Sequence, residues 1–441
     1  MSKQAKRDPV FQSMINYLVD RFSKLPDQRV GNNKFIAMKD IGLSAFSVFF
    51  TQSASFLEHQ RLMAKRQSKC NARSIFNIDH IPTDNHIRKL LDPIPPTEVF
   101  PVFDYGLKQA NEAGLLDNFR WLSDQLLIAV DGVHYFSSQQ LSCDKCSQKH
   151  HHDGTITYSH SMVSATIVNP EKSTVLPLKP EFIEPQDGHA KQDCERAAIK
   201  RWLRVQGKPY ASLNATLLGD DLYACQPICE EVLAGNYHFI FTCKKESHSC
   251  LYEWIESLEK GNNLHEIEAK VKDKNKSYSY CCRYVHQVPI RDGKDALEVN
   301  WCGVSVYDQN NKRVYSGAFI TDHEINDKNV VDIIRAGRTR WKTENEHNNT
   351  LKNHGYQLAH NFGHGKEHLS SLLATLILLS FLFHEILMLL DMRYKAVRGY
   401  LPRKMFFQQL RTILFYMYFA SWESLMECMV QACEVEVCDS S

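Results

Sequence analysis

The stretch that decides the fold runs Leu126-Leu127-Ile128-Ala129-Val130-Asp131-Gly132-Val133. Its five consecutive apolar residues predict a strand that is buried on both faces, as in the interior of a parallel or mixed sheet. Asp131 follows this strand directly. A buried carboxylate without a partner costs several kcal/mol unless a metal ion or a base compensates its charge. We therefore expect Asp131 to have a functional role.

A second predicted strand ends in the same way. The run Ala215-Thr216-Leu217-Leu218-Gly219 is followed by Asp220 and Asp221. Two strands that end in Asp favour a Mg²⁺ site, because hard divalent cations prefer carboxylate oxygens. The alternative for either acid is an N-cap on the helix that follows.

A third acidic stretch is Arg340-Trp341-Lys342-Thr343-Glu344-Asn345-Glu346, in a segment with helical pattern. Glu344, Asn348 and Lys352 recur every four residues, so one helix face could present a carboxylate to a metal ion and an amine to a phosphate. A solvated helix surface is the alternative. The two Asp sites favour the functional interpretation.

The remaining pattern predicts an α/β (α+β) fold. Turn-forming Asp292-Gly293 and Asn310-Asn311 join strand-like runs into an antiparallel meander, which would be a β-strand insertion in the sheet core. Helical pattern resumes near Asn329. Further strands are predicted at 162–168, 173–178, 237–242, 278–288, 297–307 and 313–320, with helices at 193–205 and 251–258.

The first 115 residues are predicted to be helical and to bind DNA. Apolar residues recur at helical spacing from Phe11 to Val19, and residues 1–100 hold 15 Lys/Arg against 9 Asp/Glu. A basic cluster within this region is a candidate phosphate-contacting surface, with a solvated helix face as the alternative. Its members are Arg61, Lys65, Arg66, Lys69 and Arg73.

Cys143 and Cys146 are separated by two residues, and His150, His151 and His152 follow closely. These residue types, and part of this spacing, are those of a structural Zn²⁺ site. A polar hairpin or loop between the first two core strands is the alternative.

At the three acidic stretches, and more loosely through Leu351-Lys352-Asn353-His354-Gly355-Tyr356, the sequence resembles the DDE transposases of bacterial insertion sequences. The resemblance implies a ribonuclease H-like catalytic core with a β-rich insertion between the second Asp and the Glu. It implies that Asp131, Asp220 and Glu344 are the catalytic, Mg²⁺-binding acids, with Asp221 and Glu346 as alternatives.

In that family a Tyr or Phe often stands three places beyond the second acid, as Tyr223 does here. The Arg340 to Glu344 spacing matches the family's Tyr-Arg-Glu-Lys signature, so Arg340 and Lys352 are expected to contact DNA. Gly337 stands where the signature has Tyr, and Lys352 falls one place late.

The resemblance also implies two-metal phosphodiester chemistry, with Mn²⁺ able to replace Mg²⁺. The expected partner is double-stranded DNA, as terminal inverted repeats and target DNA, held by a dimer. A ribonuclease H-like nuclease without strand transfer and a transposase-derived DNA-binding protein are the competing interpretations.

Composition fits a large folded protein. The chain has 441 residues and a net charge of +1, so DNA affinity must come from local clusters of charge. The apolar run 369–383 is expected to be a buried core helix, not a membrane span. We therefore expect no membrane partner. The resemblance to bacterial transposases implies a cytoplasmic, nucleoid-associated bacterial protein.

Five regions are expected: 1–115, helical and DNA-binding; 116–240, the first part of the core; 241–328, the insertion; 329–392, the second part of the core; and 393–441, a segment that is first basic and then acidic. The basic part, from Arg393 to Lys404, could contact the DNA backbone, and cations that favour a helix end are the alternative.

Overall fold

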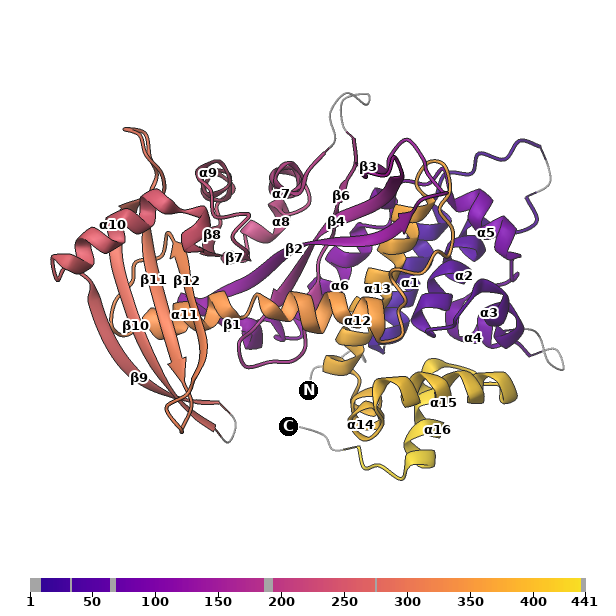
Figure 1. Cartoon of the computed structure of the whole chain (residues 1–441). Coiled ribbons are helices and arrows are strands. Elements are labelled where there is room, and N and C mark those ends of the chain that lie inside the picture. Colours follow the sequence, from indigo (N-terminus) through magenta and orange to yellow (C-terminus); the bar gives the residue numbers. More distant parts are fainter. Residues whose placement is uncertain (1–8, 32–33, 64–68, 186–192, 274–275, 438–441) are drawn as a thin grey trace.

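The structure is a computed structural model that describes residues 9–31, 34–63, 69–185, 193–273 and 276–437 (Figure 1). One mixed sheet runs through the molecule in the order β3-β4-β2-β7-β8-β12-β11-β10-β9. The pairs β2–β7 and β7–β8 are parallel, and the other neighbours are antiparallel. Short strands β1, β5 and β6 pair with β2 or β4.

The strands confirm most of the predicted runs, and β2 and β4 extend beyond them. The run 173–178 yields only the two residues of β5, where Pro177 has no N–H to continue a ladder. The strands are β1 Arg120–Trp121, β2 Gln125–Ser138, β3 Ser147–His150, β4 Ile156–Val168, β5 Leu176–Pro177, β6 Glu181–Ile183, β7 Ala215–Gly219, β8 His238–Thr242, β9 His265–Asp273, β10 Lys276–Pro289, β11 Glu298–Tyr307 and β12 Arg313–Thr321.

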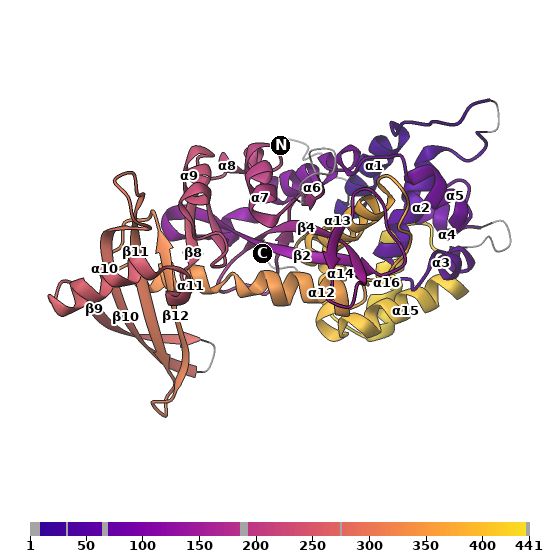
Figure 2. The ribbon, with the colours of Figure 1, turned by 45° about the horizontal axis from the view of Figure 1, so that its top comes forward.

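The insertion extends the core sheet. Strands β9 to β12 form an antiparallel meander, and β12 pairs with β8 through Phe319, Ile320 and Thr321. In Figures 1 and 2 this part forms one end of an elongated molecule. The fold class predicted from the sequence is confirmed, because an α/β mixed-sheet core carries a β-strand insertion and follows a helical N-terminal region.

Helices cover both faces of the core sheet. In both views α7, α8 and α9 lie on one face, and α11 and α12 lie on the other (Figures 1 and 2). Short helical turns η3 and η4 span Leu122–Asp124 and Lys245–Ser247. The helices of this part are α7 Glu195–Arg204, α8 Lys208–Ala211, α9 Gln226–Ala234, α10 Ser249–Lys260, α11 Val330–Arg338, the π-helical turn η5 Thr343–Asn348 and α12 Asn349–Asn353.

The N-terminal helices surround α13 (Leu369–Leu390), which is far from them in sequence (Figure 1). The ring of Phe46 lies 4.9 Å from that of Phe383, and Phe50 lies 4.5 Å from the His384 ring. The described helices that precede β1 therefore share a core with α13. Their helices are α1 Val10–Ser23, α2 Met38–Phe50, α3 Phe56–Met63, α4 Asn71–Phe76, α5 Asp84–Leu91, η1 Pro96–Glu98, α6 Pro101–Glu112 and η2 Leu116–Phe119.

Within the described residues, α13 is the one helix that is long and apolar enough to cross a membrane, and 89% of its most apolar window is buried inside the protein. It is a core helix, as predicted. Three helices follow it: α14 Met392–Tyr400, α15 Arg403–Tyr416 and α16 Trp422–Cys433.

Candidate active site

The sheet register brings Asp131 and Asp220 together. Ala129 of β2 is level with Leu218 of the parallel strand β7. Continued two residues beyond this pair, the register leads to Asp131 and Asp220, and the negative charge of Asp220 raises the pKa of Asp131. Asp131 lies within β2, because this strand continues to Ser138, whereas Asp220 directly follows β7.

The helical segment across this face adds the third predicted acid. Arg340 Nη1 lies 2.7 Å from Glu344 Oε1 and 3.9 Å from Asp131 Oδ1. Asn348 Nδ2 donates to Asp131 Oδ2 at 2.9 Å. The structure therefore brings Asp131, Asp220 and Glu344 to one site, with Arg340 between two of them.

A buried lysine fixes this helical segment on the core. Lys342 Nζ donates to the carbonyl oxygens of Asn169, Pro170 and Lys172 at 2.6, 3.0 and 2.5 Å. These carbonyls belong to the turn that follows β4. Lys342 lies directly before η5, a π-helical turn of the kind that occurs frequently at functional sites.

The pKa of Asp131 is raised to about 7. Burial is the largest cause, and the negative charges of Glu344, Glu195 and Asp220 add to it, while Arg340 acts in the opposite direction. This site therefore holds more negative charge than its one arginine neutralises. Such an excess fits a cation-binding site.

A fourth carboxyl, Glu195, was not predicted. It stands at the start of α7, accepts a hydrogen bond from the Tyr223 hydroxyl at 2.5 Å, and has a pKa that burial raises. A Cβ at position 132 would overlap Glu195 Oε2, so Gly132 leaves room for this side chain. Tyr223 follows Asp220 by three residues and so ties Glu195 to the site.

The two alternative acids lie elsewhere. Asp221 accepts hydrogen bonds from the Lys244 amide and the Ser247 hydroxyl, and His248 lies 3.3 Å away, so it stabilises the segment after β8. Glu346 lines a different pocket, beside Glu385 and Arg403. The geometry therefore favours Asp220 and Glu344 over these alternatives.

The candidate DNA-contacting residues are spread over the molecule. Arg340 is at the acidic site, and Lys352 is half-buried on α12, with no hydrogen bond or ion pair to any residue that the structure describes. Arg61 is exposed on α3, far from Lys352 in the sequence. Lys65 and Arg66 lie outside the described residues.

The C-terminal basic segment is partly used inside the protein. Arg403 lies 3.3 Å from Glu385 of α13, and Arg393 lies 2.8 Å from Glu427 of α16. Arg398 donates to the Leu401 carbonyl. These three arginines therefore hold the last helices in place.

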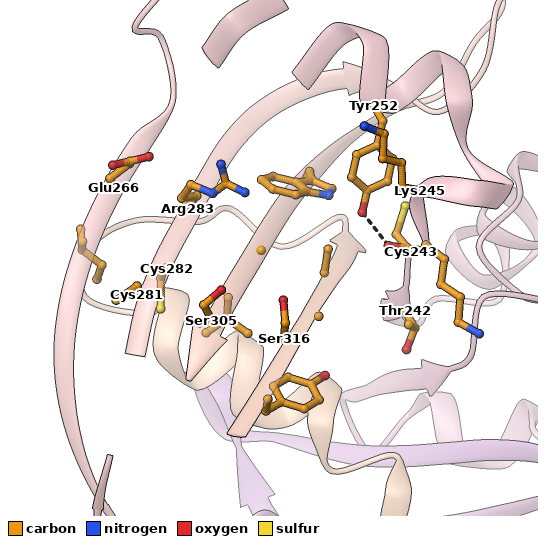
Figure 3. Close-up of a pocket in the computed structure, with 18 of the residues that line it drawn as sticks. Thr242, Cys243, Lys245, Tyr252, Glu266, Cys281, Cys282, Arg283, Ser305 and Ser316 are labelled. Carbon is orange, nitrogen blue, oxygen red and sulfur yellow. Dashed lines mark hydrogen bonds between the residues drawn. The ribbon is translucent and has the colours of Figure 1, made fainter. Parts of the chain in front are cut away.

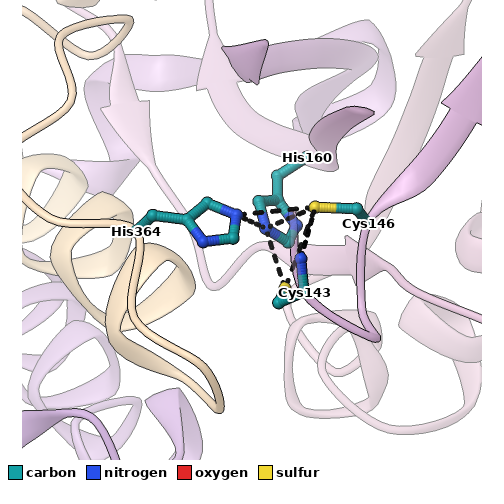
Figure 4. Close-up of side chains that lie close together, drawn as sticks. All are labelled: Cys143, Cys146, His160 and His364. Carbon is teal, nitrogen blue, oxygen red and sulfur yellow. Dashed lines mark hydrogen bonds between the residues drawn. The ribbon is translucent and has the colours of Figure 1, made fainter. Parts of the chain in front are cut away.

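The cysteine pair has different histidine neighbours from those expected. The structure brings Cys143 and Cys146 to His160 of β4 and His364, instead of His150, His151 and His152 (Figure 4). His150 and His152 are exposed, and His151 Nε2 lies 2.8 Å from the Thr157 hydroxyl.

A wide pocket of about 870 Å³ opens on the insertion sheet (Figure 3). It contains none of the three acids. Its lining mixes Lys244, Lys245 and Arg283 with Glu246, Glu266 and Glu268, so it carries no excess charge of one sign. This pocket defines no ligand class by itself.

No protein-family model matches the sequence, and no curated protein matches it. A cryo-EM structure of the piggyBac transposase synaptic complex with hairpin DNA is similar to this chain with a TM-score of 0.44 and 8% sequence identity. The match covers 98% of this chain and 84% of that one.

Proposed function

We propose that the protein is a DDE transposase that cleaves and joins DNA at the ends of an insertion sequence, using Mg²⁺ bound by Asp131, Asp220 and Glu344. The observation that carries the proposal is the convergence of these acids from two parallel strands and a facing helix. Asp220 lies 89 positions after Asp131, and Glu344 lies 124 positions after Asp220. Both nevertheless raise the pKa of Asp131.

The residues present fit such an ion. The site offers carboxylate oxygens, the donors that Mg²⁺ and Mn²⁺ prefer. Burial raises the pKa of the half-buried Asp131, the negative charges of Glu344, Glu195 and Asp220 raise it further, and a bound cation would offset both effects. When bound, Mg²⁺ would activate a water molecule or a DNA 3′-hydroxyl and would stabilise the leaving 3′ oxygen.

The chain's own groups prepare the site. Asn348 orients the Asp131 carboxylate by donating to Oδ2, and Arg340 holds Glu344 beside it. Burial raises the pKa of Asp131 to about 7, and this carboxyl must release its proton before it can act as a ligand. Loading of the site should therefore become tighter as the pH rises through 7.

The DNA contacts form part of the same proposal. Arg340 is the basic residue nearest to the acids and would contact a phosphate there. Arg61 and the basic residues near it in the sequence would bind DNA phosphates away from the acidic site. Such phosphate contacts fix the position of a protein on the duplex. Activity on chromosomal DNA would place the protein in the cytoplasm, near the nucleoid.

Two element ends must be cut for one transposition event, so we propose a dimer on DNA. An Asp131→Asn protein mixed with wild type should then suppress transposition more than dilution alone does. A loss proportional to the mixing ratio would instead indicate monomers that act independently.

The central experiment measures cleavage and joining of a plasmid that carries the DNA flanking the gene on both sides. Asp131→Asn, Asp220→Asn and Glu344→Gln should each reduce cleavage to about 1% of wild type or less, because an amide cannot replace a charged metal ligand. DNA binding should persist. Asp221→Asn and Glu346→Gln are the matched controls and should retain most of the activity.

The outcomes separate the competing functions. Cleavage without joined products would indicate a nuclease, and binding without cleavage by the wild type would indicate a DNA-binding protein. Near wild-type cleavage by any one of the three variants would remove that residue from the proposed site.

A further inference from the structure

We propose that a Cys₂His₂ site between the β2–β3 loop and the segment before α13 binds a structural Zn²⁺ ion (Figure 4). Its four ligands are Cys143, Cys146, His160 and His364. The site is separate from the candidate active site and does not depend on the proposed function.

The distances between the ligand atoms match a tetrahedral zinc site. Zn–S bonds of about 2.3 Å and Zn–N bonds of about 2.05 Å in a tetrahedron separate S and S by about 3.8 Å, S and N by about 3.6 Å, and N and N by about 3.3 Å. In the structure the two Sγ atoms are 3.8 Å apart, three Sγ to Nε2 distances are 3.5, 3.4 and 3.5 Å, and the two Nε2 atoms are 3.2 Å apart. The agreement is within about 0.2 Å, the tolerance expected of a real site.

Neither a disulfide nor a hydrogen-bonded histidine pair fits these distances as well as zinc does. A disulfide needs an S–S distance of about 2.05 Å, far shorter than the 3.8 Å observed. Hydrogen bonds alone account for these contacts less well, because the two thiols and a His160 Nε2–H offer at most three protons for five contacts of 3.8 Å or less. A cation between the four atoms gives all of them a partner.

The groups around the ligands prepare them for metal binding. His364 Nδ1 lies 2.9 Å from the Gly365 carbonyl oxygen, which fixes the proton on Nδ1 and leaves Nε2 free to coordinate. The Cys143 amide donates to Cys146 Sγ at 3.5 Å, and the Cys146 amide donates to the Cys143 carbonyl, so the loop forms a tight turn around both sulfurs.

Charge and burial also suit zinc. Zn²⁺ with two thiolates and two neutral imidazoles forms a site with no net charge, which can be buried at little electrostatic cost. Binding converts two thiols to thiolates, and their two protons pass to the solvent. Cys146 and His160 are buried, while Cys143 and His364 are half-buried and leave a path for the ion.

The site would join segments that are distant in the sequence. The cysteines follow β2, the strand of Asp131, and His364 lies just before α13, the helix around which the N-terminal region packs. Lys145 reinforces the same junction, since its Nζ lies 2.8 Å from His368 Nδ1. Zinc should therefore stabilise the whole chain.

A second cluster of possible metal ligands in the described residues consists of His238, Asp322 and His323. It differs from the cysteine site because its groups already have hydrogen-bond partners. Asp322 accepts from the Phe239 amide at 2.8 Å and pairs with His238, and His323 pairs with Thr216. Hydrogen bonds within the sheet satisfy these groups, so they need no ion.

Elemental analysis of full-length protein, grown with added zinc and purified without chelator, tests the proposal. We expect one zinc ion per chain, and a visible absorption spectrum of tetrahedral, thiolate-bound Co²⁺ after exchange. Cys143→Ser and His364→Asn should lower the zinc content about tenfold or more, while Cys194→Ser and His151→Asn should not.

Alkylation followed by mass spectrometry tests the wild type without any variant. Zinc should protect Cys143 and Cys146 from alkylation after the metal-stripped protein is reloaded, and exposed Cys194 should react equally in both states. A zinc-free wild type, a Cys143–Cys146 disulfide, or full zinc content in His364→Asn would overturn the proposal.

Discussion

The ionised Asp131 that the proposed activity needs lowers the stability of the metal-free protein. Its carboxyl belongs to a buried strand and lies near three other carboxyls, so its pKa rises from 3.8 to about 7. A carboxyl whose pKa is higher in the folded state than in the unfolded state binds more protons in the folded state. The stability of the metal-free protein should therefore fall as the pH rises from about 4 to about 7.

Asp131→Asn should accordingly stabilise the protein in Mg²⁺-free buffer. The expected gain in the free energy of unfolding is at most about 4 kcal/mol at pH 8 and about 1.6 kcal/mol at pH 5, where the folded wild type is already protonated. Urea denaturation at the two pH values measures this gain. A larger gain at pH 5 than at pH 8 would contradict the assigned pKa.

Gly132 gives a second test at the residue scale. Gly132→Ala should cost about 1–2 kcal/mol, because the new methyl group displaces Glu195 from its bond with the Tyr223 hydroxyl. In a Glu195→Ala background the same change should cost much less, since the space is then empty. Thermal unfolding of the four proteins in this cycle measures the coupling, and equal costs in both backgrounds would show that Glu195 does not constrain position 132.

The sequence identified the acids of the candidate site better than their neighbours. Asp131 and Asp220 could be singled out because each comes at the end of an apolar run, and their catalytic role stays a prediction. Glu195 and the pair His160 and His364 could not be singled out, because only the folded sheet and the loop before α13 bring them near their partners. The nearby residues His150, His151 and His152 were a more obvious match to the cysteines than a histidine more than 200 positions away.

At the scale of elements, strands with apolar runs were predicted well. β7 matches its predicted run, and α7 begins and ends within two residues of the expected bounds. β9 was missed although Ile267, Ala269 and Val271 alternate with charged residues, which is the period-two pattern of an edge strand with one exposed face. The parallel register of β2 and β7, which brings the acids together, depends on tertiary packing and left no local signal.

The segment of Glu344 gives the prediction for this scale. Lys342→Met should lower the free energy of unfolding by about 2–4 kcal/mol, because three carbonyl oxygens lose a charged donor. It should also reduce cleavage, since the helical segment that presents Glu344 is no longer fixed to the turn after β4.

Lys352→Met on the same segment is the control for stability, because the structure gives Lys352 no partner among the residues it describes. Melting temperature and cleavage are measured together for both variants. A destabilised Lys342→Met protein that cleaves normally well below its melting temperature would show that Lys342 does not position Glu344.

At the scale of the whole molecule, the N-terminal helices and the sheet core are joined by α13. Its buried face packs against α2, and Asn71 of α4 is tied to α15 by bonds from Nδ2 to the Leu414 and Met417 carbonyls. The N-terminal region therefore lacks a separate core. Its proposed role in DNA binding is best tested in the full chain, with Arg61→Ala, because a 1–115 fragment would expose the surface that covers α13.

This shared core predicts one cooperative unfolding transition. Phe383→Ala should cost about 3–5 kcal/mol, because a fully buried ring is removed from the contact with Phe46. Hydrogen exchange should then speed up in α2 and in α13 together. Phe35→Ala, at a ring that is 74% exposed, is the matched control and should change stability by less than about 0.5 kcal/mol. Two separate transitions, with only one of them shifted by Phe383→Ala, would show instead that the N-terminal helices fold independently of the sheet core.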